Sequence, residues 1–198
     1  MALPNFNIEN ECGGLVVGID EAGRGPLCGP VVAACCLLKD RQNYPQGLND
    51  SKKLSAKKRG EILAQLQNVA IFAIGEVGVE IIDKINILNA TKLAMKMAFE
   101  NFCAQHVANP DVALVDGNFV PEINCSARAI IKGDAKSLSI AAASVVAKEH
   151  RDKVMANLHE ELPQYCWAQN KGYGTKAHYE AIEKFGVSKH HRRSFRLY

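Results

Sequence analysis

The sequence predicts an α/β fold on three observations. Segments with strand character and segments with helical period follow one another in the order strand, strand, helix, strand, helix, strand, strand, helix. Most of the strand candidates are nearly continuous apolar runs, as is typical of interior strands. Three of the five run into a carboxylate close to a glycine. With 198 residues, of which 47% are hydrophobic, the chain can bury a proper core, and we expect a single domain over residues 1–198.

The first two strands flank a glycine-rich loop. Residues 15–20 and 31–38 are the strand candidates, and the connection between them, 22–30, contains three glycines and two prolines. The first strand ends in two adjacent acids, Asp20 and Glu21. Because neighbours on a regular strand point to opposite faces, both acids can face one site only if the strand is distorted. We therefore predict irregular backbone from about Glu21.

The remaining elements follow from apolar periodicity and capping residues. In order, they are a polar lead-in at 1–13, a helix that Ser55 caps and that runs to about Asn68, a strand at 69–77, a helix at 87–106, strands at 111–115 and 126–131, an alanine-rich helix at 139–153 and a last helix that ends near Lys184. The small residues of the alanine-rich helix would let it lie close against a sheet or another helix.

Three carboxylates follow three of these strands. If the first, fourth and fifth strands lie side by side and parallel, their C-terminal ends bring Asp20, Asp116 and Asp134 together at one edge of the sheet. Ligands in open α/β sheets favour that edge. Packed carboxylates repel one another unless cations neutralise them, and oxygen ligands favour Mg²⁺ or Mn²⁺ over zinc. Two such ions, roughly 4 Å apart, suit in-line displacement at a phosphodiester.

Two glycine-flanked residues are candidates for substrate contact. In Gly23-Arg24-Gly25 the glycines let backbone approach a ligand closely, and the 2′-hydroxyl of a ribose is a suitable target for such a loop. Tyr173 lies between Gly172 and Gly174. Its ring could stack on a sugar or base, or it could fill a gap over the core, and the residues alone leave both readings open.

Basic residues gather in two segments, 52–59 and 184–196. They are either solvated surface or a flank that meets phosphates. The net charge of +3 is mild, so it permits nucleic-acid binding without requiring it. Two further functions therefore stay open beside a metal-dependent nuclease: a non-catalytic nucleic-acid-binding module that uses the basic segments, and a phosphatase that acts on small substrates.

Composition also bears on the compartment. The seven cysteines include no C-x-x-C pair, which argues against structural zinc and favours a reducing compartment. The N-terminal residues lack a secretory signal pattern, and no apolar run is long enough to cross a membrane. We expect a cytoplasmic protein with no membrane partner. No heptad or spare amphipathic helix is evident, so we expect a monomer.

Six motifs resemble, in order, those of bacterial ribonuclease HII, a type 2 ribonuclease H family. They are V-G-I-D-E-A-G-R-G-P at 17–26, D-S-K-K-L at 50–54, L-V-D-G-N at 114–118, K-G-D-A at 132–135 with S-I-A-A-A-S-V-V-A-K-E-H-R-D at 139–152, G-Y-G-T-K-A-H at 172–178 and H-R-R-S-F at 191–195. Together they span almost the whole chain, so their joint occurrence is highly specific.

The resemblance implies a ribonuclease H-like fold, with a five-stranded mixed sheet flanked by helices and a helical C-terminal portion, residues of about 155–198, that binds substrate. It also implies cleavage of the RNA strand of RNA/DNA hybrids, and incision 5′ to single ribonucleotides embedded in duplex DNA. The products would carry 5′-phosphate and 3′-hydroxyl ends. Such an activity serves ribonucleotide removal during DNA replication and repair.

The resemblance also assigns residues. The catalytic and metal-binding acids would be Asp20, Glu21, Asp116 and Asp134, which would hold Mn²⁺ or Mg²⁺, with two ions once substrate is bound. Gly23, Arg24 and Gly25 would read the 2′-hydroxyl at the RNA–DNA junction, and Tyr173 would stack on the deoxyribose beside it. Ser51 and Lys52, in the second motif, would contact substrate as well.

Overall fold

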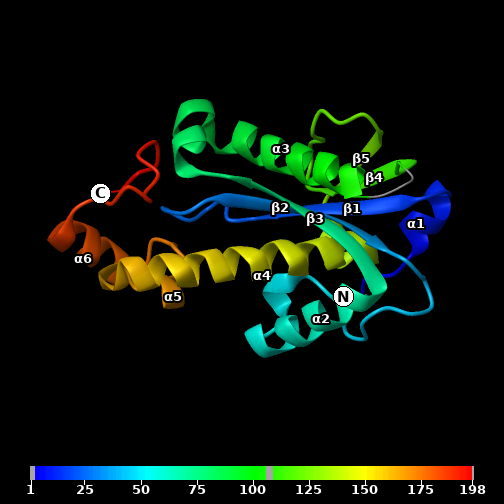
Figure 1. The fold of residues 1–198 in the computed structure, drawn as a ribbon, viewed down its shortest axis with the longest axis horizontal. Helices are drawn as coiled ribbons and strands as arrows, with labels where there is room; N and C mark the ends of the chain where they lie inside the picture. The colour runs from blue at the N-terminus through cyan, green and yellow to red at the C-terminus, as the bar shows by residue number, and fades with distance from the viewer. Residues whose placement is uncertain (1–2, 106–108, 198) are drawn as a thin grey trace.

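The protein is built on one five-stranded sheet with helices on both faces (Figure 1). The computed structural model describes residues 3–105 and 109–197. The strands are β1 Val16–Ala22, β2 Val31–Leu38, β3 Ala70–Val77, β4 Val112–Asp116 and β5 Ser126–Ile130. The helices are α1 Asn7–Cys12, α2 Ala56–Val69, α3 Val79–Gln105, α4 Leu138–Glu161, α5 Trp167–Asn170 and α6 Lys176–Phe185, and short 3₁₀ turns lie at Ser51–Lys53, Gly133–Ala135 and Pro163–Tyr165.

The sheet is mixed, with strand order β3-β2-β1-β4-β5. β1, β4 and β5 run parallel to one another, whereas β2 is antiparallel to both of its neighbours. This arrangement confirms the predicted α/β class and the predicted side-by-side placement of the first, fourth and fifth strands. Because these three strands are parallel, their C-terminal ends meet at one edge of the sheet.

Each face of the sheet buries its own apolar cluster. Val17 and Ile19 of β1 pack with Met95 and Phe102 of α3, which covers one face. The other face, which carries Ala34 of β2 among others, is covered by α4 and α2. Figure 1 shows α3 on one side of the strands and α4 with α2 on the other. Close packing of buried apolar side chains on both faces keeps the sheet rigid where its C-terminal edge carries side chains.

α4 lies so close to β1 that only glycine fits at the crossing. A Cβ added to Gly18 would lie 2.1 Å from the backbone carbonyl carbon of Ser139 and 2.3 Å from the nitrogen of Ile140. Three consecutive alanines follow in α4, Ala141–Ala143, and all are fully buried. The expectation that small residues bring this helix onto the sheet is therefore confirmed.

One predicted helix is longer in the structure, and another is preceded by a short helix that the sequence analysis missed. α4 continues past the predicted end at Lys153 to Glu161, and Met155 in this extension is buried. The short helix begins at Val79, and a break at Asn86, where φ is 67°, separates it from the helix predicted to begin at 87, so that predicted start is confirmed. The predicted C-terminal end of this helix, His106, lies outside the described residues.

The lead-in at 1–13 contains a helix that the sequence analysis missed. Glu9 of α1 is buried, and its Oε1 accepts hydrogen bonds from Ser137 Oγ at 2.6 Å and from Ser139 N at 3.0 Å. The carboxylate thus lies at the N-terminus of α4, where the helix dipole favours a negative charge. A six-residue polar helix has no periodicity of its own to reveal it, since this tertiary contact holds it.

β1 remains regular through its two acids. Glu21 pairs with Ala33 and Ala22 with Val32 in the ladder to β2, so the prediction of irregular backbone from Glu21 is wrong. The ladder satisfies the backbone beyond the acids, and the chain turns only at Gly23, where φ is +97°. Asp20 and Glu21 therefore leave the strand toward opposite faces.

The C-terminal portion is held together by a buried network of hydrogen bonds. Trp167 Nε1 donates to His178 Nε2 at 3.0 Å, and His191 Nε2 lies 3.1 Å from the same atom. His178 Nδ1 therefore carries the proton and donates to the Tyr173 carbonyl oxygen at 2.9 Å. His191 carries its proton on Nε2, because its Nδ1 accepts from Ser188 N at 3.0 Å. Both histidines are neutral and buried rather than free to meet phosphates.

The described parts of the chain hold no helix with the length and apolarity needed to cross a membrane. All seven cysteines are free thiols.

Gly18→Ala should strongly destabilise the fold, because the added methyl group would collide with the backbone of α4. We expect a loss of at least about 1–3 kcal/mol in the free energy of unfolding, measured by urea denaturation. Gly60→Ala in α2 is the matched control, since a Cβ there meets nothing within 4 Å. It should raise stability by up to about 1 kcal/mol. Equal stability of the two variants would contradict the close crossing.

The buried histidines should make stability fall at acidic pH. Burial, followed by the neighbouring His178, lowers the pKa of His191 to about 4 from 6.5, so below pH 6.5 the unfolded chain takes up a proton that the folded chain refuses. The free energy of unfolding should therefore decline from pH 6.5 toward 4. His191→Gln should show a shallower decline in urea titrations over this range and an unchanged slope between pH 7.5 and 9. Identical acid slopes would refute the neutral buried pair.

Candidate active site

Three carboxylates converge at the edge of the sheet where the parallel strands end. Asp20, Asp116 and Asp134 each offer an oxygen, and these oxygens all lie within 4.8 Å of one another. Asp20 stands near the end of β1, Asp116 is the last residue of β4, and Asp134 lies in the 3₁₀ turn that follows β5. The predicted convergence of strand-end carboxylates is therefore observed.

The turn after β5 is shaped to bring Asp134 inward. Lys132 adopts a left-handed conformation, with φ of 56°, and Gly133 N donates to Asp116 Oδ1 at 2.6 Å. A Cβ on Gly133 would lie 2.5 Å from Ile140 Cδ1, so a side chain here would press on α4. This hydrogen bond links the turn that carries Asp134 to Asp116 at the end of β4.

The acids resist ionising together. Burial raises the pKa of Asp20 well above its ordinary value, and the charges of Glu21 and Asp116 raise it further. Burial, then Asp116 and Asp50, raises the pKa of Asp134 to about 6. A divalent cation would offset both burial and repulsion, and hard oxygen donors are the ligands that Mg²⁺ and Mn²⁺ prefer. The donor set therefore fits such an ion.

Glu21 lies outside this group of three. Its Oε1 forms an ion pair with Arg24 Nη1 at 3.3 Å, and it follows Asp20 on a regular strand, so it starts from the other face of the sheet. Burial raises its pKa, and Arg24 opposes that rise. Glu21 nevertheless lines the same cleft as Gly23, Arg24 and Gly25.

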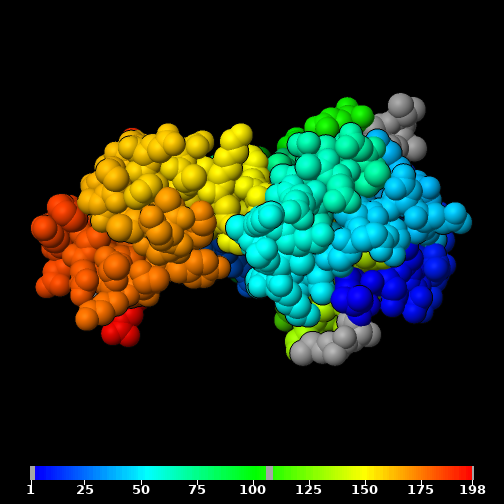
Figure 2. Space-filling model, turned by 90° about the horizontal axis from the view of Figure 1, so that it is seen from below, coloured from blue at the N-terminus to red at the C-terminus, as the bar shows by residue number. Residues whose placement is uncertain are grey.

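The cleft beside the acids has a volume of about 630 Å³. Its walls come from distant parts of the chain: Glu21, Ala22, Gly23, Arg24, Gly25, Ser51, Lys52, Ile87, Lys148, Arg151 and Tyr173. In Figure 2 the C-terminal portion stands as one mass and α2 with the N-terminal residues as another, with a hollow between them. Residues of both masses line the cleft, so a long ligand could contact both.

Ser51 and Lys52 lie close to the acids, although the two side chains differ in exposure. Ser51 is buried, and its N–H donates to Ser144 Oγ at 3.2 Å. Partial burial opposes a rise in the pKa of Lys52, but the charges of Asp20 and Asp134 raise it overall. Lys52 is thus a cation that faces the carboxylates from the cleft wall.

Arg59, in the first basic segment, is turned into the protein. Its Nε lies 2.7 Å from Glu149 Oε1 and its Nη2 lies 3.1 Å from Asp152 Oδ2. The side chain is 9% exposed, so it is neither solvated nor free to meet a phosphate. Neither interpretation of the segment 52–59 holds for this residue.

The Gly23-Arg24-Gly25 loop presents its backbone to the cleft. A Cβ on Gly23 would lie 2.0 Å from Arg151 Nε, so the loop can pack here only with glycine. Among the residues that the structure describes, none accepts a hydrogen bond from the N–H groups of Gly23, Arg24 or Gly25. These donors line a cleft and are available to a ligand.

Tyr173 faces the same loop from the C-terminal portion. Its side chain is 47% exposed, and its Cε1 lies 3.5 Å from where a Cβ on Gly25 would be. The ring therefore does not fill a gap over the core, which was one of the two open readings. It stands at the cleft wall next to the loop and is partly accessible.

Sequence reasoning did not single out several residues of this region. Lys148 and Arg151 both line the cleft, three residues apart on α4, and this helical spacing was a signal that could have found them. Arg192 is completely buried beneath the loop, and no local pattern distinguishes it from Arg193 beside it. The two arginines differ in burial only once the chain is folded.

Comparison with known proteins agrees with this geometry. The family model of ribonuclease HII matches residues 17–198. A ribonuclease HII of Wolbachia pipientis is 48% identical over 98% of this chain and 97% of its own length. Ribonuclease HII in the structure of its PCNA complex from Archaeoglobus fulgidus superimposes with a TM-score of 0.78 at 25% identity, over 93% of this chain and 96% of that chain.

A ribonuclease H2 from Pyrococcus horikoshii OT3 also shares the fold, with a TM-score of 0.71 at 25% identity, over 92% of this chain and 94% of that chain. The expected ribonuclease H-like fold is thus confirmed. Family model, curated relatives and solved structures all cover nearly the whole chain, which belongs to the ribonuclease HII family.

Proposed function

We propose that this ribonuclease H is a metal-dependent endonuclease that cleaves the RNA strand of RNA/DNA hybrids and incises 5′ to single ribonucleotides in duplex DNA. The observation that carries the proposal is the convergence of Asp20, Asp116 and Asp134 within 4.8 Å at the sheet edge. Beside them lies a cleft with free backbone donors and an accessible aromatic ring. Metal ligands and contacts suited to a sugar-phosphate chain thus occur together.

The three converging acids would hold Mn²⁺ or Mg²⁺, and Glu21 would join them once it leaves Arg24. Bound there as a pair, the ions would activate water and stabilise the leaving oxygen of an in-line displacement, which gives 5′-phosphate and 3′-hydroxyl ends. The assignment of Glu21 requires its carboxylate to move, whereas the other three already face one another. The raised pKa values of Asp20 and Asp134 support a site that is completed by cations.

The remaining residues of the cleft would bind and orient the nucleic acid. The N–H groups of Gly23, Arg24 and Gly25 would receive the 2′-hydroxyl, which distinguishes a ribonucleotide from a deoxyribonucleotide. Tyr173 would stack on the deoxyribose that follows, where a 2′-hydroxyl is missing. Ser51 and Lys52 would contact the backbone phosphates, and Lys52 is supported in this role by its position near the acids.

Two other functions fit less well. A non-catalytic binding module would rely on the basic segments, but Arg59 and Arg192 are buried and already bonded. A cluster of carboxylates would also oppose the binding of a polyanion. A phosphatase for small substrates would not need a cleft that is walled by the C-terminal portion.

We propose that the enzyme acts as a monomer in ribonucleotide removal during DNA replication and repair, in the cytoplasm.

Asp20→Asn should abolish cleavage while the protein still binds duplex. The substrate is a DNA duplex with one ribonucleotide, incubated with Mn²⁺ or Mg²⁺ and resolved on a denaturing gel. Because an amide is a poor metal ligand, we expect the cleavage rate to fall by at least about a hundredfold. A chelator should stop cleavage by the unmodified protein. Cleavage that resists chelator, or a fully active Asp20→Asn variant, would overturn the metal mechanism.

Tyr173→Ala should lower kcat/KM on the same duplex by roughly tenfold, as expected for the loss of one stacking contact. Tyr173→Phe keeps the ring and should retain most of the activity. If the alanine variant were as active as the parent, Tyr173 would have no role in stacking. An equal loss in both variants would assign the effect to the hydroxyl group instead.

A further inference from the structure

The loop of residues 23–30 is held by one completely buried guanidinium, that of Arg192. Arg192 has an exposed fraction of 0% and lies under the loop 23–30, which it reaches from the other end of the chain. It donates to five carbonyl oxygens: Nε to Gly29 at 2.9 Å, Nη1 to Arg24 at 3.1 Å and Pro26 at 2.8 Å, and Nη2 to Gly23 at 2.6 Å and Pro30 at 3.1 Å. A guanidinium has five N–H donors, so each has its own acceptor.

Among the described residues no carboxylate lies within ion-pair distance of Arg192 or of its neighbour Arg151, and Asp83 acts on Arg192 only from farther away. Arg151 likewise donates to carbonyl oxygens, those of Cys28, Pro30 and Lys171, at 3.0, 3.1 and 2.9 Å. Carbonyl dipoles of the loop thus replace the lost hydration of both charges. An unpaired buried charge is costly, so any loop conformation that withdraws these carbonyls is strongly disfavoured.

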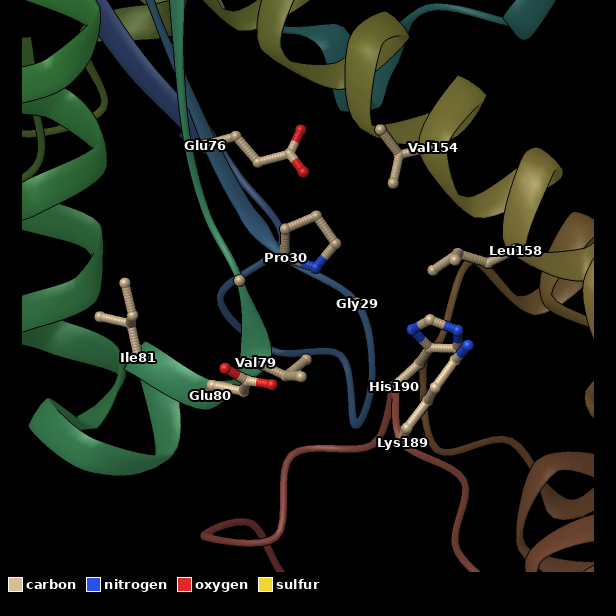
Figure 3. Close-up of a pocket in the computed structure, with 11 residues that line it drawn as sticks. Gly29, Pro30, Glu76, Val79, Glu80, Ile81, Val154, Leu158, Lys189 and His190 are labelled. Atoms are coloured by element: carbon tan, nitrogen blue, oxygen red, sulfur yellow. The ribbon is translucent and has the colours of Figure 1, made fainter.

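The backbone around Arg192 locks it to the same loop. Arg192 N donates to Leu27 O at 2.8 Å, and Gly29 N donates to His190 O at 2.9 Å. Figure 3 shows His190 and Lys189 on the C-terminal tail beside the turn that carries Gly29 and Pro30, at the rim of a cavity of about 410 Å³. This cavity shares no lining residue with the cleft beside the three acids.

The carbonyls of the loop are therefore bound from beneath, while no described residue accepts a hydrogen bond from the N–H groups of Gly23, Arg24 and Gly25, which line the cleft. We propose that Arg192 is a positioning residue for substrate selection: it sets the carbonyls of Gly23 and Arg24 and thereby aims the loop's N–H groups at the 2′-hydroxyl. This inference rests on the proposed function. Arg192 itself touches no substrate, since it has no exposed surface.

The test compares the binding of two duplexes by a non-cleaving form of the full chain. Asp20→Asn is the parent, and the double variant Asp20→Asn/Arg192→Lys keeps the positive charge but has three donors instead of five. Each is titrated, in Mg²⁺, with a DNA duplex that carries one ribonucleotide and with the same duplex in all-DNA form. We expect the preference for the ribonucleotide to fall at least fivefold, about one hydrogen bond. Affinity for the all-DNA duplex should be unchanged.

A purely structural role would not give this pattern. Ile182→Val, in the same C-terminal core but without contact to the loop carbonyls, is the matched control for lower stability, and it should keep the full preference. An unchanged preference in the Arg192→Lys variant would overturn the proposal, and so would an equal loss of affinity for both duplexes or a similar loss in Ile182→Val.

A second measurement does not depend on the variant folding. In the ¹⁵N-labelled unmodified protein, backbone order parameters of Gly23, Arg24 and Gly25 should be near 0.85, as in rigid backbone, and values below about 0.6 would overturn the proposal. Failure of the proposed function has a different signature. In that case the unmodified protein would not cleave the ribonucleotide duplex, and the Asp20→Asn parent would show no preference to lose.

Discussion

Electrostatic repulsion among three carboxylates, two of them buried, is the constraint on which the rest of the molecule depends. Asp20, Asp116 and Asp134 come within 4.8 Å only because three parallel strands hold their ends in register. Burial and this close placement raise the pKa values of Asp20 and Asp134. The apolar clusters on both faces of the sheet, and the α4 crossing at Gly18, supply the rigidity that keeps like charges together. A softer scaffold would separate them.

The cleft beside these acids depends on a different part of the protein. The strand that carries Asp20 passes directly into the Gly23-Arg24-Gly25 loop, so the acids and the loop's backbone donors are only a few residues apart. The loop's shape, however, is determined from a distance by Arg192 and Arg151. The same C-terminal portion presents Tyr173 and, through His178, hydrogen-bonds the Tyr173 carbonyl. The acids and the loop thus lie beside one cleft, and the C-terminal portion holds the loop in place.

Much of the fold and of the candidate site was predictable because the signals are local. Strand-end acids, the Ser55 cap and the glycines around Arg24 each reflect a preference within a few residues, and the structure confirms the strands, the cap and the meeting of the three acids. Predictions failed where a tertiary contact overrides the local signal. β1 stays regular past Glu21 because β2 pairs with it, and α1 forms because its Glu9 carboxylate is bound at α4.

The sequence by itself therefore determined the α/β order of elements, the three acids and the loop that follows the first of them. Only the tertiary structure decided which basic residues are available to a ligand. Arg192 and Arg193 are neighbours with the same side chain, yet the first is buried with five carbonyl acceptors and the second is exposed. The reason is physical: burial and hydrogen-bond partners come from segments far apart in the chain, and no local pattern encodes them.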